Sequence, residues 1–286
     1  MLTVFVTGLA VGTLYAAIAL AYNVMFSTSK VLSLTTGHLA MLGGVFGAWF
    51  IQAWQLPWWI AMIGSMAVGA LFGLITELLA IRRVLNKSDE HLWLLSTLAV
   101  ATMVQQGVGL WWGTEPKPFP RLFVQDFGAG VLDQKFWLPI GATVILALGL
   151  SLFYRRTMYG KLFVAMSEDA FAARARGIST DRIRMMSYVL SGALGGLAGF
   201  AAGQLTFAFF ALGHLLTLNG FIALAVGGLG SNAGALLGGA ILGLLNAFAS
   251  YWFGGEYQQT IAVGILLLVL LVKPEGMFGS RNVRPV

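Results

Sequence analysis

Few side chains in this sequence of 286 residues have the types and spacing that catalysis needs. There is no Cys, which excludes disulfides, thiolate nucleophiles and cysteine-ligated zinc. His38, His91 and His214 lie in separate segments, so no metal site is expected. The sequence contains neither a GxxxxGK[ST] loop, which would cradle ATP phosphates, nor an HExxH or GxSxG motif. We therefore expect a protein that is not an enzyme and that binds no cofactor itself.

Acidic residues are almost absent from the apolar segments. Glu77 is the only acid clearly inside one, near its end and one turn from Arg82, where a structural ion pair is expected. An ion-coupled carrier normally needs such a group within a span, where an ionisable residue costs about 2.5–3.5 kcal/mol and persists only with a purpose. The sequence thus argues against an ion-coupled secondary transporter, which together with a channel subunit is the alternative interpretation.

Polar positions in the apolar segments and at their ends are the remaining candidates for contact with a solute. Those expected to line a substrate pathway are Thr35, Thr36, His38, Gln204, Asn219, Gly228 and Asn232. Each could equally form hydrogen bonds between helices, which are typically worth about 0.6 kcal/mol. The stretch Gly227–Gly234 is the strongest candidate, because non-helical backbone at membrane depth is tolerated only where it is buried in protein or lines a cavity.

The elements that must position these residues are membrane-spanning helices, as the composition shows. The chain is 58% hydrophobic and only 10% charged, with a mean hydropathy of +0.83. Soluble chains carry about 25% charged residues, so a soluble globular enzyme is excluded, as is a disordered or coiled-coil protein. We expect an all-α, polytopic transmembrane helical bundle that forms a single permease-like domain over residues 1–286.

Apolar stretches of about 20 residues, the length that crosses a bilayer, predict eight or nine membrane segments. One stretch is too long for a single span and is interrupted by glycines, so a broken helix in two pieces is expected there. The predicted stretches are Leu2–Phe26, Thr36–Trp54, Trp58–Ile81, Leu92–Gly113, Phe136–Phe153, Ser187–Phe210, Asn219–Phe253 (the broken one) and Thr260–Val272.

Basic residues are distributed unequally between the loops. If the N-terminus is outside and the broken stretch crosses twice, most of the 17 Lys and Arg residues fall in inner loops, as the positive-inside rule requires. This distribution predicts a multi-pass protein of a bacterial inner membrane, with its N-terminus outside and its C-terminus cytoplasmic. It also explains the net charge of +6, so nucleic acid is not an expected partner.

The inner loop over residues 155–186 is basic, amphipathic and rich in alanine. Ala172 and Ala173 belong to an expected short helix with a flat face of small side chains. Gly177 suits the end of this helix, where a left-handed residue is often required. Such a face could dock into a groove of a partner protein, or the helix could lie on anionic lipid. The residues by themselves leave both interpretations open.

Five stretches in order along the chain are similar to one known family. They are Gly8–Leu20 (GLAVGTLYAAIAL), Glu77–Leu85 (ELLAIRRVL), Phe171–Ile178 (FAARARGI), Gly220–Gly239 (GFIALAVGGLGSNAGALLGG) and Val272–Gly279 (VKPEGMFG). The third closely resembles the EAA-type loop of ABC-importer permeases. Together they resemble the permease subunits of branched-chain amino-acid ABC importers. The length and the short N-terminus are more similar to the smaller permease of the pair.

This resemblance implies an ATP-driven importer and its partners. Such permeases work with a second homologous permease, two ATP-binding cassette subunits that hydrolyse ATP, and a periplasmic or surface substrate-binding protein. Whether the second permease is a different chain or another copy is left open. By matching position, the ATPase-coupling segment would comprise Ala172, Ala173, Arg174, Arg176, Gly177 and Ile178.

Two departures from the family pattern bear on these implications. Phe171 stands where the family usually has Glu, so Arg174 and Arg176 are the residues expected to meet an acidic rim. In Ser33–His38 only Gly37 is retained from the family's polar stretch. The expected substrates are therefore branched-chain or other hydrophobic amino acids, or a related small polar or carboxylated solute.

Overall fold

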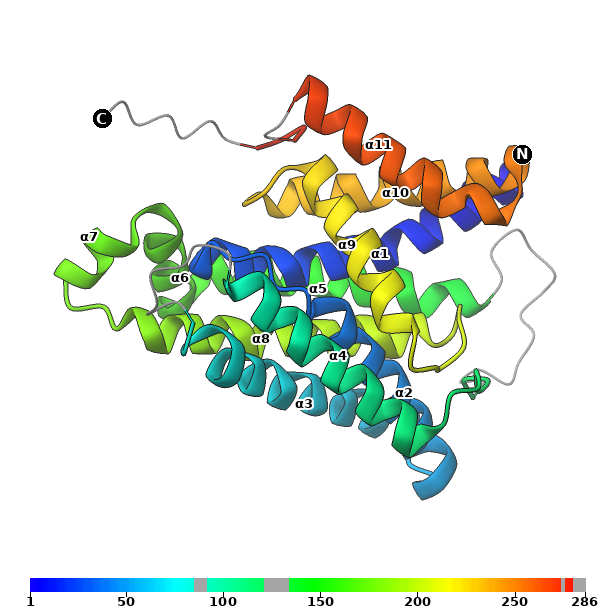
Figure 1. The fold of residues 1–286 in the computed structure, drawn as a ribbon, viewed down its shortest axis with the longest axis horizontal. Helices are drawn as coiled ribbons and strands as arrows, with labels where there is room; N and C mark the ends of the chain where they lie inside the picture. The colour runs from blue at the N-terminus through cyan, green and yellow to red at the C-terminus, as the bar shows by residue number, and fades with distance from the viewer. Residues whose placement is uncertain (85–91, 121–133, 274–275, 280–286) are drawn as a thin grey trace.

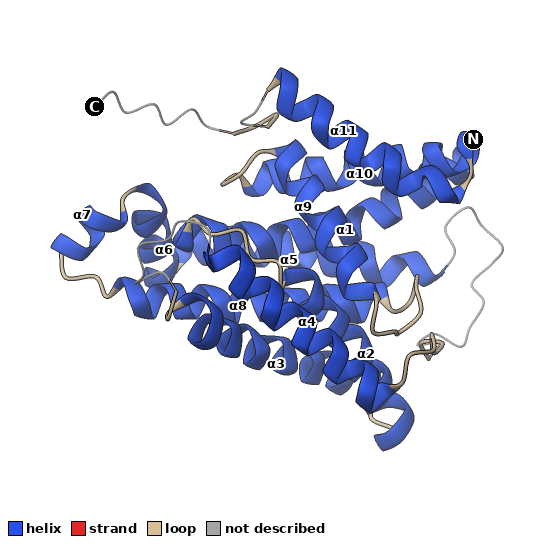
Figure 2. Ribbon diagram, viewed as in Figure 1, coloured by secondary structure: helices blue, strands red, loops and turns tan. Residues whose placement is uncertain are grey.

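A computed structural model describes residues 1–84, 92–120, 134–273 and 276–279. The regular secondary structure of these residues is helical, without a β-strand, and loops connect the helices (Figure 2). A single isolated bridge joins Lys117 to Ala208. The helices are α1 (Leu2–Ser29), α2 (Thr36–Trp54), α3 (Trp58–Thr76), α4 (Leu92–Trp112), α5 (Trp137–Arg156), α6 (Met158–Glu168), α7 (Ala170–Ala175), α8 (Thr180–Ala202), α9 (Leu212–Gly227), α10 (Asn232–Phe253) and α11 (Gln258–Val272). A π-helical turn, Glu77–Ile81, extends α3, and short 3-10 turns, Gln134–Phe136 and Gly255–Tyr257, precede α5 and α11.

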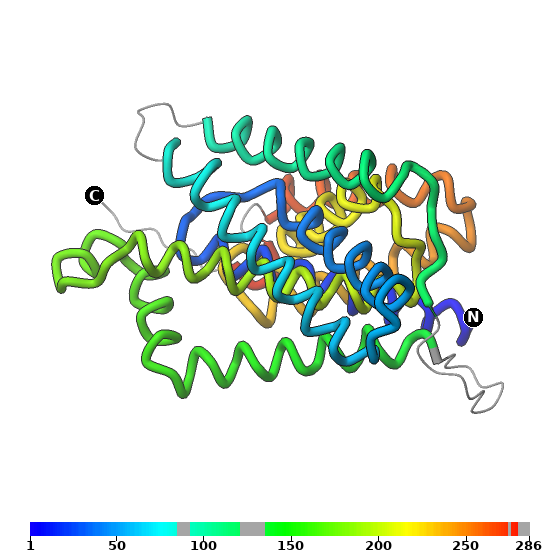
Figure 3. The backbone as a smooth tube through the Cα atoms, turned by 90° about the horizontal axis from the view of Figure 1, so that it is seen from below, coloured from blue at the N-terminus to red at the C-terminus, as the bar shows by residue number. Residues whose placement is uncertain are grey.

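Helices α1 and α8 form the interior of the bundle. In the apolar 18-residue stretch of each helix, 72% of the residues are buried in α8 and 61% in α1, but only 17% in α4 and 6% in Gly255–Val272. Helix α8 packs against α1, α2 and α3, and α1 also packs against α10. Helices α4 and α5 lie on opposite sides of the bundle (Figure 3). The peripheral helices therefore present the apolar surface that a membrane or a partner must cover.

Small residues allow the interior helices to approach one another closely. A Cβ atom added at Gly199 of α8 would collide with the backbone of Ala40 in α2. Such contacts are typical of membrane helices, in which small side chains allow close packing of the backbones. The glycine content of the chain, 37 residues, thus has a structural explanation in this part of the bundle.

Within the described residues, seven helical segments are long and apolar enough to cross a membrane, fewer than the eight or nine predicted. Helix α2 is not among them because polar residues such as His38 and Gln52 lower its hydropathy, and α9 has only 16 residues. The predicted break is present, since Gly228–Ser231 separates α9 from α10.

The largest error in the predicted boundaries concerns α8. The helix runs from Thr180 to Ala202, whereas the predicted stretch was Ser187–Phe210. It begins earlier because the charged residues of its first turns are helical too, and Arg184 is buried by an ion pair. It ends earlier because residues 203–211 turn back toward the loop that follows α4, where Ala208 forms two backbone hydrogen bonds with Lys117.

Helices α6 and α7 project from one end of the bundle, beyond the other helices (Figures 1 and 3). The N-terminus lies at the opposite end (Figure 1). The predicted inner loop is therefore a structured pair of short helices that stands clear of the spanning segments.

Candidate functional site

A non-helical segment between α1 and α2 enters the interior of the bundle. Helix α1 ends at Ser29, and residues 31–35 are non-helical and largely buried before α2 begins at Thr36. The first turn of α2 lies beside the middle of α9, because Gly37 contacts Thr217 so closely that no Cβ would fit. Backbone of this kind at membrane depth is tolerated only inside protein or along a cavity. The segment 31–35 is non-helical and largely buried, which is the property that was expected of Gly227–Gly234.

The centre of the site is His38, which three other elements contact. Its Nε2 lies 3.1 Å from Oε1 of Gln105 in α4, and its Nδ1 lies 3.3 Å from Oγ1 of Thr217 in α9. The same Nδ1 lies 3.3 Å from the carbonyl oxygen of Leu34, to which the Thr217 hydroxyl is also directed at 3.4 Å. These four residues, called the His38 cluster below, join α2, α4, α9 and the segment 31–35.

Hydroxyl groups satisfy the polar backbone of the segment 31–35. Ser33 Oγ and Thr35 Oγ1 are 2.7 Å apart, and Thr36 Oγ1 donates to the carbonyl oxygen of Ser33 at 3.2 Å. The backbone N–H of Leu34 donates to Thr97 Oγ1 at 3.5 Å. Because buried backbone groups are costly without partners, this run of Ser and Thr explains how the segment can leave the helical conformation.

Polar side chains beside the cluster reach the molecular surface. Gln106 of α4 and His214 of α9 are exposed, although both lie in helices that are otherwise apolar. Gly213, the residue before His214, lies so close to the ring of His38 that an added Cβ would collide with it. Exposed polar groups in membrane-spanning helices would be unfavourable against lipid, so the exposed sides of α4 and α9 that carry Gln106 and His214, together called the α4–α9 face below, are expected to meet a water-filled space or a partner. His214 and Thr217 were not predicted as pathway residues, because both lie between the predicted stretches Ser187–Phe210 and Asn219–Phe253.

The predicted pathway residues fall into four places, the last of which is the break between α9 and α10 described below. Thr35, Thr36 and His38 belong to the cluster and the hydroxyl groups around it. Asn219 is buried on α9, two residues beyond Thr217; its Nδ2 donates to Leu215 at 3.1 Å, while its Oδ1 has no partner among the described residues. Gln204 lies apart from the His38 cluster, because its Nε2 donates to the carbonyl oxygen of Pro120, in the loop that follows α4, at 3.1 Å.

The break Gly228–Ser231 lies apart from the His38 cluster. Asn23 of α1 donates to Oδ1 of Asn232 at 2.6 Å and accepts from the N–H of Gly230 at 2.9 Å. On another side, the N–H groups of Met277 and Phe278 donate to the last carbonyl oxygens of α9. Gly228 and Asn232 are therefore enclosed by α1 and the C-terminal residues, which gives their polar groups structural partners.

In the projecting loop, Asp169 and Gly177 bound the short helix α7. Asp169 Oδ1 accepts from the backbone N–H groups of Phe171 and Ala172, both at 2.9 Å. Gly177 has a φ of +82°, the left-handed conformation predicted for it. Asp carboxylates commonly cap helix N-termini in this way, and Gly commonly follows their C-termini. The loop is thus a defined helix rather than an irregular connection.

The predicted coupling residues do not all face outward. Ala172, Arg174, Arg176 and Gly177 are exposed and Ile178 is half-buried, but Ala173 is only 4% exposed. The sequence placed Ala173 on the outer face, whereas the structure turns it inward. In its place Phe171 is 83% exposed at the start of α7.

Glu77 is buried in an ion pair, but its partner differs from the one expected. Its Oε1 lies 3.2 Å from Nε of Arg184 in α8, and Arg82 is not involved. Arg184 also binds Asp181 at 3.0 Å. The π-helical turn at Glu77–Ile81 locally widens the helix at this pair, and such turns often occur at functional positions. The prediction failed because Arg184 is distant in sequence and only folding brings the two together.

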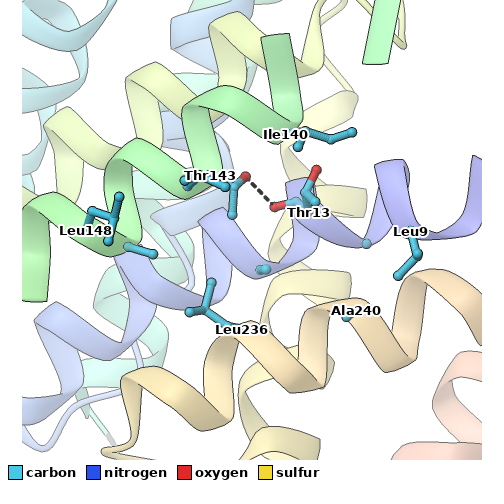
Figure 4. A pocket seen from close by; sticks show the side chains of 11 residues that line it. Leu9, Thr13, Ile140, Thr143, Leu148, Leu236 and Ala240 are labelled. Carbon is cyan, nitrogen blue, oxygen red and sulfur yellow. Dashed lines mark hydrogen bonds between the residues drawn. The ribbon is translucent and has the colours of Figure 1, made fainter. Parts of the chain in front are cut away.

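A groove of about 450 Å³ lies between α1, α5 and α10 (Figure 4). Its lining is apolar except for Thr13 and Thr143. Both hydroxyls are already hydrogen-bonded to backbone carbonyl oxygens, and Thr143 donates to that of Thr13 at 2.9 Å. The groove therefore offers no free polar group that could recognise a solute, unlike the α4–α9 face.

The described residues contain no group of three or more His, Asp or Glu side chains that could hold a metal ion. His91 and residues 121–133 of the outer loop lie outside the described residues. The His38 cluster consists of His38, Gln105, Thr217 and the carbonyl group of Leu34, so the chemistry that it offers is hydrogen bonding by a histidine and uncharged groups.

The fold and the site define a polytopic helical membrane protein with a buried polar cluster around His38 and a projecting helical loop. The protein belongs to the family described as the permease component of branched-chain amino acid transport systems, whose pattern matches residues 4–270. It is accordingly a transport permease, and this membership favours neither an ion-coupled carrier nor a channel.

Similar proteins support the same family across nearly the whole chain. The chain is 28% identical to LivH of Escherichia coli, a high-affinity branched-chain amino acid transport system permease protein, over 98% of this chain and 96% of that protein. It is 29% identical to BraD of Pseudomonas aeruginosa, which carries the same description, with the same shares covered. The structure of PsaBC from Streptococcus pneumoniae in complex with Fab shares the fold, with a TM-score of 0.54, 15% identity, and 95% of this chain and 92% of that chain covered.

Proposed function

We propose that this chain is a permease subunit of an ATP-driven ABC importer for branched-chain or other hydrophobic amino acids, or a related small polar or carboxylated solute. The observation that carries the proposal is the similarity to LivH and BraD over 98% of the chain. The chain has no ATP-binding motif of its own, so ATP hydrolysis belongs to partner subunits. The subunit is neither an enzyme nor the holder of a cofactor, and it has no role with nucleic acid.

The substrate pathway runs along the α4–α9 face beside the His38 cluster. A second permease, homologous or identical, covers this face and encloses the polar groups that lipid would not tolerate. His214 and Gln106 then contact the solute or water, while Gln105 and Thr217 hold the ring of His38. The proposal is supported by the exposure of His214 and Gln106 in otherwise apolar helices.

The projecting helices α6 and α7 form the coupling loop. Phe171 and Ala172 supply a small apolar contact, and Arg174 and Arg176 are available to meet an acidic rim on the ATPase subunit. Basic residues concentrate in this loop, so it lies in the cytoplasm and the N-terminus at the other end of the bundle lies outside. The complex then needs two ATPase subunits and an external substrate-binding protein, in a bacterial inner membrane.

Purification from the native membrane tests this assembly. The tagged chain, extracted in mild detergent, is expected to retain a second permease and two ATP-binding cassette subunits, identified by native mass spectrometry. A chain that emerges alone or only with copies of itself, from extracts in which the ATPase subunits are intact, would contradict the proposal.

A further inference from the structure

Lys30 connects the projecting loop to the segment that enters the bundle. It directly follows α1, and its Nζ donates a hydrogen bond of 2.8 Å to the carbonyl oxygen of Ser167, in the last turn of α6. A lysine is favourable there because the carbonyl groups at a helix C-terminus carry partial negative charge. This bond adds a direct link between the loop and the start of the segment 31–35 to the packing of α6 against α1.

The backbone of Lys30 adopts a conformation that is unusual for its residue type. Its φ is +55°, in the left-handed region that costs a residue other than glycine roughly 1–2 kcal/mol. The N–H of Lys30 completes α1 by donating to Phe26 at 2.9 Å, so this conformation is what turns the chain out of the helix. Strain of this kind persists only where surrounding structure maintains it, and it often marks a functional position.

The segment that follows Lys30 ends in the His38 cluster. The carbonyl oxygen of Leu34, four residues after Lys30, lies within 3.4 Å of both His38 Nδ1 and Thr217 Oγ1. Residues 31–35 lack helical backbone hydrogen bonds and are held largely by the Ser and Thr side chains described above. A displacement of Lys30 is therefore transmitted to Leu34 and changes the hydrogen bonds of His38.

The end of α1 has a second attachment that does not involve α6. Thr28 donates to Ser187 of α8 at 2.6 Å, and both residues are buried. This attachment holds α1 to the interior of the bundle irrespective of Lys30. Because the Lys30 bond is exposed, its contribution to stability is small, so removing it should not unfold the protein.

We propose that Lys30 is a positioning residue for transport, which transmits displacement of α6 and α7 to the segment 31–35 and hence to the His38 cluster. The inference rests on the proposed function, since it requires that an ATPase subunit moves the coupling loop. It assigns to Lys30 a role distinct from that of the predicted coupling residues 172–178, because among the described residues no hydrogen bond joins those residues to the segment 31–35.

Three variants in the purified complex, reconstituted in liposomes, test the role. Lys30→Gly removes the donor but tolerates the left-handed conformation, so it isolates the side chain from the backbone. Lys30→Arg keeps a donor with a similar reach. Lys161→Ala removes another lysine of α6, which is exposed, and serves as the matched control. The measurements are ATP hydrolysis, uptake of radiolabelled leucine, and recovery of the complex.

Lys30→Gly is expected to lower the leucine taken up per ATP hydrolysed by about fivefold, within the range found for residues that transmit coupling, with complex recovery and ATP hydrolysis nearly unchanged. Lys30→Arg and Lys161→Ala should retain the ratio of the unaltered complex. An unchanged ratio in Lys30→Gly would overturn the inference, and so would a parallel loss of complex recovery and uptake, which indicates a structural role. Failure of the unaltered complex to take up leucine, other hydrophobic amino acids or small carboxylated solutes with ATP would instead refute the proposed function on which the inference rests.

Discussion

At the scale of single residues, the side chains that carry the proposed function are those whose environment contrasts with their chemistry. Phe171 is apolar and exposed on a loop that stands clear of the bundle, whereas His214 and Gln106 are polar and exposed on apolar helices. Each of these exposures is unfavourable in the isolated chain, and contact with a partner, a solute or water would relieve it. We therefore expect these residues to lie where the subunit contacts the ATPase subunit, the second permease or the solute.

Phe171→Glu should weaken binding of the ATPase subunit. Burial of a Phe side chain contributes roughly 1.5–3 kcal/mol, so its loss corresponds to about a tenfold or larger decrease in affinity. Phe171→Leu retains most of the apolar area and should bind nearly as well. Titration of purified ATPase subunit onto the permease measures both. Equal affinity for Phe171→Glu and the unaltered chain would place the contact elsewhere on the loop.

His38→Ala should impair transport without impairing assembly. The substitution leaves Gln105 and Thr217 without their shared partner, and the loss of such a hydrogen bond costs about 0.5–1.5 kcal/mol, or up to roughly tenfold in rate. Thr13→Ala is the control, since Thr13 is also polar and within a span but lies in the apolar groove of Figure 4. Equal uptake by the two variants would show that the His38 cluster does not contribute to the pathway.

At the scale of elements, hydropathy predicts where helices lie but not how deep their ends reach. The predicted start of α2 at Thr36 is correct, yet no pattern in the sequence indicates that residues 31–35 return into the bundle. That depth depends on contacts of Leu34 with Thr217, which are 183 residues apart. The same reason explains the wrong partner predicted for Glu77, since Arg184 is 107 residues away. Local pattern identifies elements, whereas the polar contacts between them require the folded chain.

Close packing of α8 against α2 predicts a large effect of one methyl group. Gly199→Ala places a Cβ against the backbone of Ala40, which cannot yield as a flexible side chain could, so a destabilisation of about 1–3 kcal/mol is expected. Gly107→Ala is the matched control: it also lies in a spanning helix, but nothing stands within 4 Å of its added Cβ. Thermal unfolding in detergent should show a lower midpoint for Gly199→Ala only. Indistinguishable midpoints would contradict the close approach of α2 and α8.

At the scale of the whole molecule, the two ends of the bundle differ in what they present. One end carries the projecting helices α6 and α7, and the other carries the N-terminus and residues 113–120, which follow α4 (Figure 1). In the proposed function, the orientation of the protein in the membrane, its coupling to the ATPase and the delivery of solute by the binding protein all depend on this difference between the two ends. Most of it could be predicted from the Lys and Arg distribution, because charge is a local property of the sequence.

The orientation is testable because the chain contains no Cys. Single cysteines at Arg176, on the projecting loop, and at Glu115, at the other end, replace exposed residues. A membrane-impermeant maleimide added to intact spheroplasts should label Glu115→Cys and should reach Arg176→Cys only after lysis. The reverse pattern would overturn the proposed orientation.

The central claim, that this subunit serves an ATP-driven importer, is tested most directly by uptake in a defined system. Liposomes containing the purified complex, loaded with ATP and supplied outside with the binding protein and radiolabelled leucine, should accumulate leucine against its gradient. Accumulation should persist when proton and sodium gradients are abolished and should stop when ATP is replaced by a non-hydrolysable analogue. Accumulation driven by an ion gradient in the absence of ATP would contradict the account.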